Sequence, residues 1–235
     1  MAYKLKRIIT SIMVSTVFIL TGCAGGGGGY FGSSSSVDPR LKNNPDIEFF
    51  SRSGLTACAA GAGLGIAGCL LSNSSKKAEC ALIAAVAGCG VGIGANAYLD
   101  YNRKKYGSEE EALNSAISDM KVENNRLERI NQINKQVIID NKATLDKLSK
   151  EIANNTINAD MAEKQLKSID ANINFLRDTL AKAKERQANW EKVSNSTSAD
   201  SSELDEQIAQ MNEKVQALES ELDSLFTQRS AIKLS

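Results

Sequence analysis

The sequence is 235 residues long, contains no histidine, and balances 28 lysines and arginines against 28 aspartates and glutamates. Without histidine the chain lacks the usual general base and the commonest zinc ligand, and its charge balance gives no reason to bind nucleic acid. Both prolines, Pro39 and Pro45, lie near the beginning, so no later residue forbids helix. We therefore expect an all-α protein that is not an enzyme and uses no cofactor, metal or nucleic-acid partner.

The first residues have the pattern of a secretion signal. Three cationic side chains precede an uncharged run over residues 8–20, which is shorter than the roughly 20 apolar residues that cross a bilayer. The run ends in Leu20, Thr21, Gly22 and Cys23, and this motif closely resembles the lipobox of bacterial lipoproteins. The resemblance implies that residues 1–22 are removed and that Cys23 carries palmitate and other acyl chains. The alternative is an ordinary secretion signal with a chance cysteine.

The lipobox also implies a location. Two or more acyl chains hold a protein stably at a membrane, and the glycine and serine runs that follow form a flexible tether, so we assign residues 23–54 to a lipidated N-terminus and tether. Gram-negative lipoproteins with aspartate after the lipidated cysteine often stay in the inner membrane. Ala24 stands there instead, so the resemblance favours the outer membrane, with the protein facing the periplasm.

Two apolar segments, residues 55–71 and 80–99, are rich in small side chains. Their glycines recur at spacings of four, which places them in one stripe of a helix and lets another backbone approach closely. The candidates for this packing are Gly61, Gly65, Gly88 and Gly92. The segments resemble the glycine zippers of bacterial envelope proteins, and we expect a helical hairpin over 55–106. A G-x-G-x-x-G match at 63–68 lacks the preceding strand of a nucleotide site, so we reject that function.

Four cysteines remain once Cys23 is assigned to the lipid, and an even number in an oxidising compartment suggests disulfides. Folding the hairpin about its polar link at 72–77 places Cys69 opposite Cys80 and Cys58 opposite Cys89. This pairing requires Cys80 to lie in the loop or first turn, because Cys80 and Cys89 are half a turn out of phase. The alternative is four free thiols packed in the hairpin.

A heptad pattern begins at Ser108, where Ser108 and Glu111 form a capping box, and one register continues to residue 193. We expect residues 108–193 to form a long coiled-coil helix, on the order of 125 Å if continuous. Asparagine occupies several of its core positions, where buried amides specify register at a cost in stability. A break near Asn155, with Asp160 capping a second helix, is the alternative.

Residues 194–200 are polar and small, and they predict a linker before a second coiled-coil helix over 201–233. The shorter helix covers only part of the longer one, which would leave residues 117–138 exposed in a single chain. This predicts a homo-oligomer formed through the coiled coil. The alternative is that both helices pack inside one small bundle with no partner chain.

The sequence therefore predicts a lipid-anchored structural or interaction protein of the bacterial envelope. Its coiled coil would contact other copies, other envelope proteins or peptidoglycan. The alternative function is a membrane-active protein whose glycine-zipper hairpin forms part of a channel or secretion apparatus. An enzyme is the third class, and the missing histidine argues against it.

Overall fold

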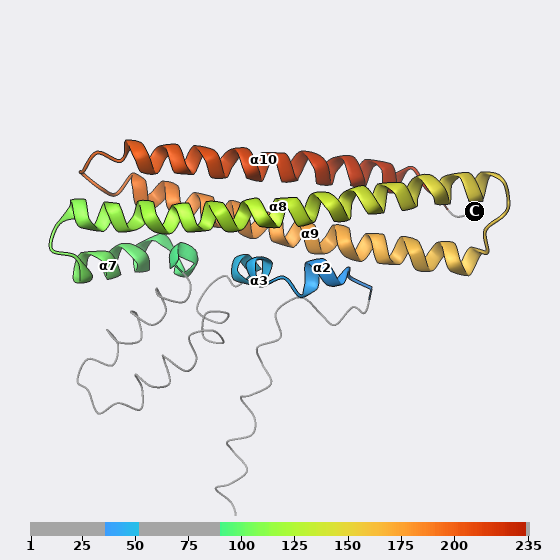
Figure 1. Cartoon of the computed structure of the whole chain (residues 1–235), viewed down its shortest axis with the longest axis horizontal. Coiled ribbons are helices and arrows are strands. Elements are labelled where there is room, and N and C mark those ends of the chain that lie inside the picture. Colours follow the sequence, from blue (N-terminus) through green and yellow to red (C-terminus); the bar gives the residue numbers. More distant parts are fainter. Residues whose placement is uncertain (1–35, 52–89, 234–235) are drawn as a thin grey trace, which may run out of the picture. The chain divides into compact units, whose positions relative to one another are not determined.

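The computed structural model describes residues 36–51 and 90–233, and every regular element in those ranges is helical, so the all-α expectation is confirmed. In chain order the elements are α2 (Pro39–Lys42), α3 (Pro45–Ser51), the 3-10 turn η1 (Gly90–Ile93), α7 (Ala95–Lys105), α8 (Glu109–Ala153), α9 (Ala159–Ser194) and α10 (Ser202–Ser230). The three long helices lie side by side as a bundle (Figure 1).

The long helices run up, down and up, so α8 and α10 are parallel and α9 is antiparallel to both (Figure 1). Two asparagines in α8 set the register of the parallel pair. The amides of Asn124 and Asn131 donate to the carbonyl oxygens of Gln207 and Lys214, at 2.8 and 2.9 Å, and both bonds have the same sequence offset. These two core asparagines thus have the register role that the sequence predicts for them.

The continuous helix expected over 108–193 is wrong, because the chain turns back between α8 and α9. Asn155 adopts the left-handed conformation at φ 53°, and the amide of Thr156 donates to the carbonyl oxygen of Glu151 at 2.9 Å. This is a Schellman ending, which asparagine tolerates better than other non-glycine residues. Asn158, rather than Asp160, then caps α9 by accepting from the Asp160 amide.

The other helix boundaries lie close to the expected ones. Ser108 caps α8 by accepting from the Glu111 amide at 3.2 Å, while the Glu111 carboxylate accepts from the Gly107 amide. α9 ends at Ser194, the first residue of the linker expected at 194–200, and α10 begins at Ser202. α10 ends at Ser230, three residues before the expected end.

The heptad stripes of all three helices face one another and form the core. Residues 117–138 are not exposed in the single chain as expected, since Met120, Leu127 and Ile138 are buried within it. The packing inside one bundle, considered above as the alternative, is what the structure has. Each buried leucine or isoleucine contributes roughly 1.5–3 kcal/mol, so the apolar stripe is the main source of stability.

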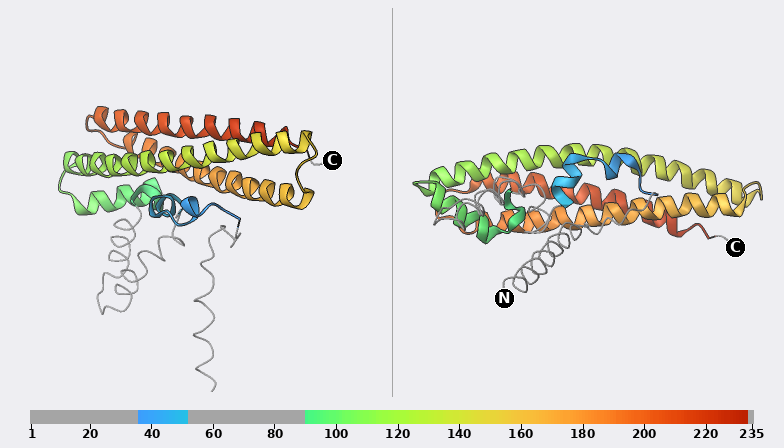
Figure 2. Two further views of the ribbon diagram at one scale, coloured as in Figure 1. Left: turned by 45° about the vertical axis from the view of Figure 1, so that its right-hand side comes forward. Right: turned by 90° about the horizontal axis from the view of Figure 1, so that it is seen from below.

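A second layer covers α8 and α9 on the side away from α10. It consists of α2, α3, η1 and α7, as Figure 2 shows in the view from below. The flexible tether expected over 23–54 is wrong for residues 36–51, which form α2 and α3 and pack on the bundle, and we call these residues the N-terminal arm. The arm buries three apolar side chains, Leu41, Ile47 and Phe50, almost completely. This face of the bundle therefore carries a second layer, which packs on α8 and α9.

The single helix expected through residues 80–99 is interrupted in its described part. η1 is a short 3-10 turn, and Gly94 follows it with φ 103°, a conformation that suits glycine. α7 begins only after this residue. Gly94 thus starts a new helix and lets the chain change direction where the sequence predicts a straight stripe.

Candidate functional site

A buried ion pair lies beneath the arm, where α8 and α9 face each other. Arg186 Nη1 of α9 lies 2.7 Å from Glu123 Oε1 of α8, and the two side chains are 3% and 4% exposed. Such burial removes most of the hydration of both charges, so the pair persists only because each neutralises the other. Burial raises the pKa of the Glu123 carboxyl, and the Arg186 guanidinium opposes that rise.

Two aromatic side chains complete the bundle side of the pair. Trp190 Nε1 donates to Glu123 Oε2 at 3.0 Å, so both carboxylate oxygens accept hydrogen bonds. The Tyr98 ring of α7 packs edge-on against the Trp190 indole, with centroids 5.2 Å apart, and its hydroxyl donates to Asp119 at 2.7 Å. We call Glu123, Arg186, Trp190, Tyr98 and Asp119 the Glu123 cluster.

The opposite side of the Arg186 guanidinium holds the arm. Nη2 donates to the backbone oxygen of Phe49 at 3.0 Å, and the guanidinium carbon lies 4.2 Å from the centroid of the Phe49 ring. The Arg126 guanidinium lies over the same ring at 4.4 Å. Both are cation–π contacts, which strengthen when the cation is withdrawn from water, as that of Arg186 is.

Two glycines of η1 bring the backbone close to the cluster. A Cβ on Gly92 would lie 2.5 Å from Arg186 Nη2, so the guanidinium occupies the space that any side chain would need. Gly90 has φ 54°, and a Cβ there would lie 3.1 Å from Glu123 Oε1. The Glu123 cluster therefore joins α3, η1, α7, α8 and α9 at one place.

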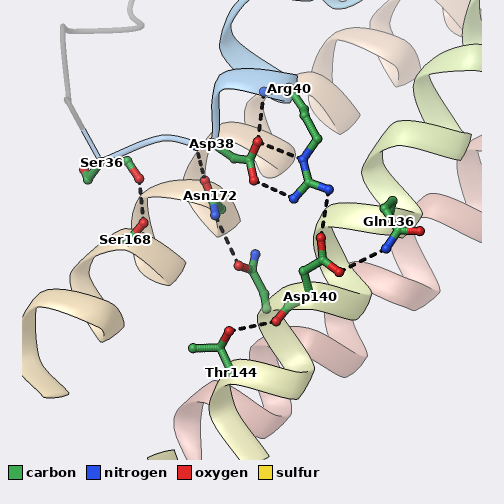
Figure 3. Close-up of polar contacts among 9 residues, drawn as sticks. Ser36, Asp38, Arg40, Gln136, Asp140, Thr144, Ser168 and Asn172 are labelled. Atoms are coloured by element: carbon green, nitrogen blue, oxygen red, sulfur yellow. Dashed lines mark hydrogen bonds and ion pairs between the residues drawn. The ribbon is translucent and has the colours of Figure 1, made fainter. Parts of the chain in front are cut away.

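A second polar cluster, on the same face, fixes the beginning of the arm (Figure 3). The Asp38 amide donates to Asn172 Oδ1 at 2.8 Å, and Asn172 in turn donates to Asn141 at 3.3 Å. Arg40 bridges Asp38 and Asp140, at 2.7 and 2.8 Å. The Arg40 hydrogen bonds hold the pKa of both carboxyls below their usual range.

A third contact fixes the middle of the arm. Asp46 accepts from Arg129 at 2.7 Å and lies 3.2 Å from Arg126, and the hydrogen bond from Arg129 is the main cause of its lowered pKa. The Arg129 side chain is 54% exposed, so this pair is screened by solvent. The Arg186 contact, in contrast, is buried and is not screened in this way.

These clusters hold the helices of the fold together through hydrogen bonds and ion pairs. Their carboxylates and amides accept or donate hydrogen bonds between the arm and the bundle. Within residues 36–51 and 90–233, no three side chains of the metal-binding types gather around a common point. In the same ranges, no helix combines the length and the apolar character of a membrane span.

Most of the residues singled out from the sequence lie outside the described ranges. They are the lipobox residues Leu20, Thr21, Gly22 and Cys23, the cysteines Cys58, Cys69, Cys80 and Cys89, and the glycines Gly61, Gly65 and Gly88. Gly92 is described, and it does permit a close approach. Its neighbour is the Arg186 side chain, however, and Gly92 lies in a 3-10 turn instead of an α-helical stripe.

The Glu123 cluster was not anticipated from the sequence, although a signal was present. The heptad positions just before each core a position (g positions) are buried along α8, at Ala116, Glu123, Ile130 and Val137. Because the g positions of α8 are buried in addition to its a and d positions, this helix contacts more than one layer of the fold. A charged residue at a g position, with Arg186 at the equivalent position of α9, marks a buried pair.

The described fold belongs to the class of antiparallel three-helix bundles, here with a docked N-terminal arm. No protein-family model, curated protein or solved structure matches this chain.

Proposed function

We propose that this chain is a lipid-anchored structural or interaction protein of the bacterial cell envelope, held at the outer membrane and facing the periplasm. Its helical bundle is the folded body that other envelope proteins or peptidoglycan contact. Lipidation at Cys23 follows from the lipobox resemblance, and the helical body follows from the fold.

One observation carries this proposal: the most deeply buried charges of the described structure attach the arm to the bundle. Arg186 bonds the Phe49 backbone on one side and Glu123 on the other. The arm is the segment that follows the lipobox, so the contact connects the membrane-proximal end of the chain to the bundle. Fully extended, the chain from Cys23 to Ser36 spans at most about 45 Å, which limits how far the bundle stands from the membrane.

The arm lies on α8 and α9, on the side away from α10 (Figure 2). A body anchored in this way exposes α10 and the outer faces of α8 and α9 to partners. α8 has 45 residues and is therefore about 68 Å long, roughly half the length expected for the continuous helix.

Lipid labelling tests the anchoring. Replacing Cys23→Ser should abolish incorporation of labelled fatty acid and leave uncleaved precursor, whereas Cys58→Ser should leave both unchanged. Sucrose-density fractionation should then place the wild-type chain with outer membranes. Labelled fatty acid on the Cys23→Ser chain would refute the proposal. In vivo crosslinking from exposed positions on α10, followed by mass spectrometry, would identify the partner.

Self-association through the coiled coil is a separate part of the proposal. Burial of the heptad stripes within one chain means that no exposed stripe demands a second copy. Analytical ultracentrifugation of the full chain without its lipid, at tens of micromolar, tests whether copies associate. A monomeric mass at those concentrations would remove homo-oligomerisation from the proposal.

The second candidate function is a membrane-active one, in which the glycine-rich segment between the arm and η1 packs in a bilayer. The described residues at its two ends favour it, because Phe49 and Gly92 contact the same guanidinium and so bring those ends together. Conductance of liposomes containing the purified protein is the test. It should be lost on replacing Gly61, Gly65 and Gly88 with leucine. Gly92 is left intact, since its replacement would disturb Arg186.

A further inference from the structure

The two ends of the glycine-rich segment meet at a single side chain. Phe49 lies just before residues 52–89 and Gly92 lies just after them, yet both contact the Arg186 guanidinium. The Phe50 ring lies near it as well, with its centroid 5.1 Å from the guanidinium carbon. The Arg186 guanidinium therefore contacts both the arm and η1, at the point where each packs on the bundle.

On the side of the bundle, the Arg186 guanidinium is held in place by Glu123 and Trp190. Glu123 fixes the guanidinium at 2.7 Å, and Trp190 fixes Glu123 at 3.0 Å. These three residues lie on α8 and α9, whose relative position is set elsewhere by their packing with α10 along both helices. Arg186 thus lies at the interface between the three-helix bundle, which has its own core, and the layer that packs on it.

The remaining ionic contacts of the arm are more exposed than the Arg186 pair. Arg40 and Asp140 are 44% and 46% exposed. Asp46 is only 14% exposed, but its partners Arg126 and Arg129 are 33% and 54% exposed. Exposed pairs of this kind add little to stability and weaken further in salt. Leu41, Ile47 and Phe50 of the arm are also buried, and the Arg186 guanidinium adds to this apolar packing a charged contact that solvent does not screen.

We propose that the N-terminal arm and η1 detach from the three-helix bundle together, as one unit, and that Arg186 is the latch that holds them. The arm leaves when the guanidinium loses Phe49 and Gly92, while α8, α9 and α10 stay packed on one another. This conformational device does not depend on the envelope function proposed above. In a lipid-anchored chain its consequence would be a longer tether, because residues 36–51 would join the linker.

Hydrogen exchange of the full chain, read by mass spectrometry, tests the latch. Arg186→Met is combined with Glu123→Gln, so that no buried charge is left without a partner and the bundle stays folded. We expect amide exchange over 45–51 and 90–98 to accelerate together, by at least about tenfold, with no change over 127–150, 166–180 and 208–225. Arg177→Met is the matched control, because Arg177 lies on the same helix but stacks on Phe226 of α10, at 4.1 Å.

Three results would overturn the proposal. Faster exchange in only one of the two flanks would show that they do not move as a unit. Loss of protection along all three long helices would make Arg186 a part of the bundle core. Unchanged exchange in the double variant would show that apolar packing alone holds the arm. The Arg177→Met chain should exchange like the wild type in every one of these segments.

Discussion

The buried Glu123–Arg186 pair should behave as a coupled unit in a double-mutant cycle. Glu123→Gln leaves a guanidinium buried without its counter-charge, and Arg186→Met leaves a carboxylate in the same position. The two side chains are almost fully buried, and Arg186 Nη1 lies 2.7 Å from Glu123 Oε1. Each single variant should therefore lose about 3–5 kcal/mol of unfolding free energy.

The double variant removes both charges and should therefore lose no more than either single variant. The Arg186 hydrogen bond to Phe49 and the ion pair are gone, but nothing charged is left without hydration. The coupling free energy should therefore be at least about 3 kcal/mol, the upper end for residues in direct contact. Both single variants should lose a similar unfolding free energy, because the two side chains are buried to the same extent.

Urea unfolding at neutral pH, followed by far-ultraviolet circular dichroism, measures all four chains. The matched control is the exposed pair of Lys182 and Glu185 on the same helix, at 3.1 Å. A Lys182→Met and Glu185→Gln cycle should give a coupling below about 0.5 kcal/mol. Additive losses in the Glu123 and Arg186 cycle would refute the reasoning, since they would mean that neither charge depends on the other.

The remaining predictions concern the helix break, the pH dependence and the cysteines. Asn155→Val should lower the unfolding free energy by about 1–2 kcal/mol and Asn155→Gly by less than about 0.5 kcal/mol, because φ is 53° there; equal losses in urea unfolding would contradict the left-handed turn. The Asp46 pKa is lowered, so its contribution to stability is complete above the ordinary value of 3.8 and is lost as pH falls through the folded-state pKa; Asp46→Asn should remove that acid-side loss in thermal unfolding. Burial raises the Glu123 pKa, so the free energy of unfolding should decrease as pH rises from the ordinary value of 4.5 through the folded-state pKa, because the carboxyl ionises less readily in the folded chain than in the unfolded one; Glu123→Gln should flatten this part of the curve of thermal stability against pH. Non-reducing peptide mapping after periplasmic expression should find Cys58–Cys89 and Cys69–Cys80 bridges, and four free thiols or disulfide-linked dimers would exclude the pairing.

Local chemistry was enough to predict much of the helical part. The stripe from Leu204 to Leu225 recurs at heptad spacing and is buried as expected, and Ser108 caps α8 through the Glu111 amide. These features depend on residues a few positions apart, whose side chains meet whenever the chain is helical. The helical class of the described fold follows from them.

The turn between α8 and α9 was not decided by local chemistry. Asn155 occupies a core position in an unbroken heptad register, and asparagine both tolerates helix and adopts left-handed turns. Which conformation wins depends on whether the stripes of α8 and α9 gain more by packing on each other than by continuing as one helix. That balance is set by contacts between distant residues.

Heptad spacing and capping residues were sufficient to predict most of the helical sequence in α8, α9 and α10, the polar linker near residue 200 and the apolar faces. They did not predict the helices of the arm, the packing of the apolar faces within one chain, or the contact of Glu123 with Arg186 beneath the arm. Periodicity shows that a face must be buried, but it does not name the partner, since any apolar helix satisfies the same pattern. The pairing of two charges 63 positions apart depends on how the turns fold the chain, and so it is a property of the assembled bundle.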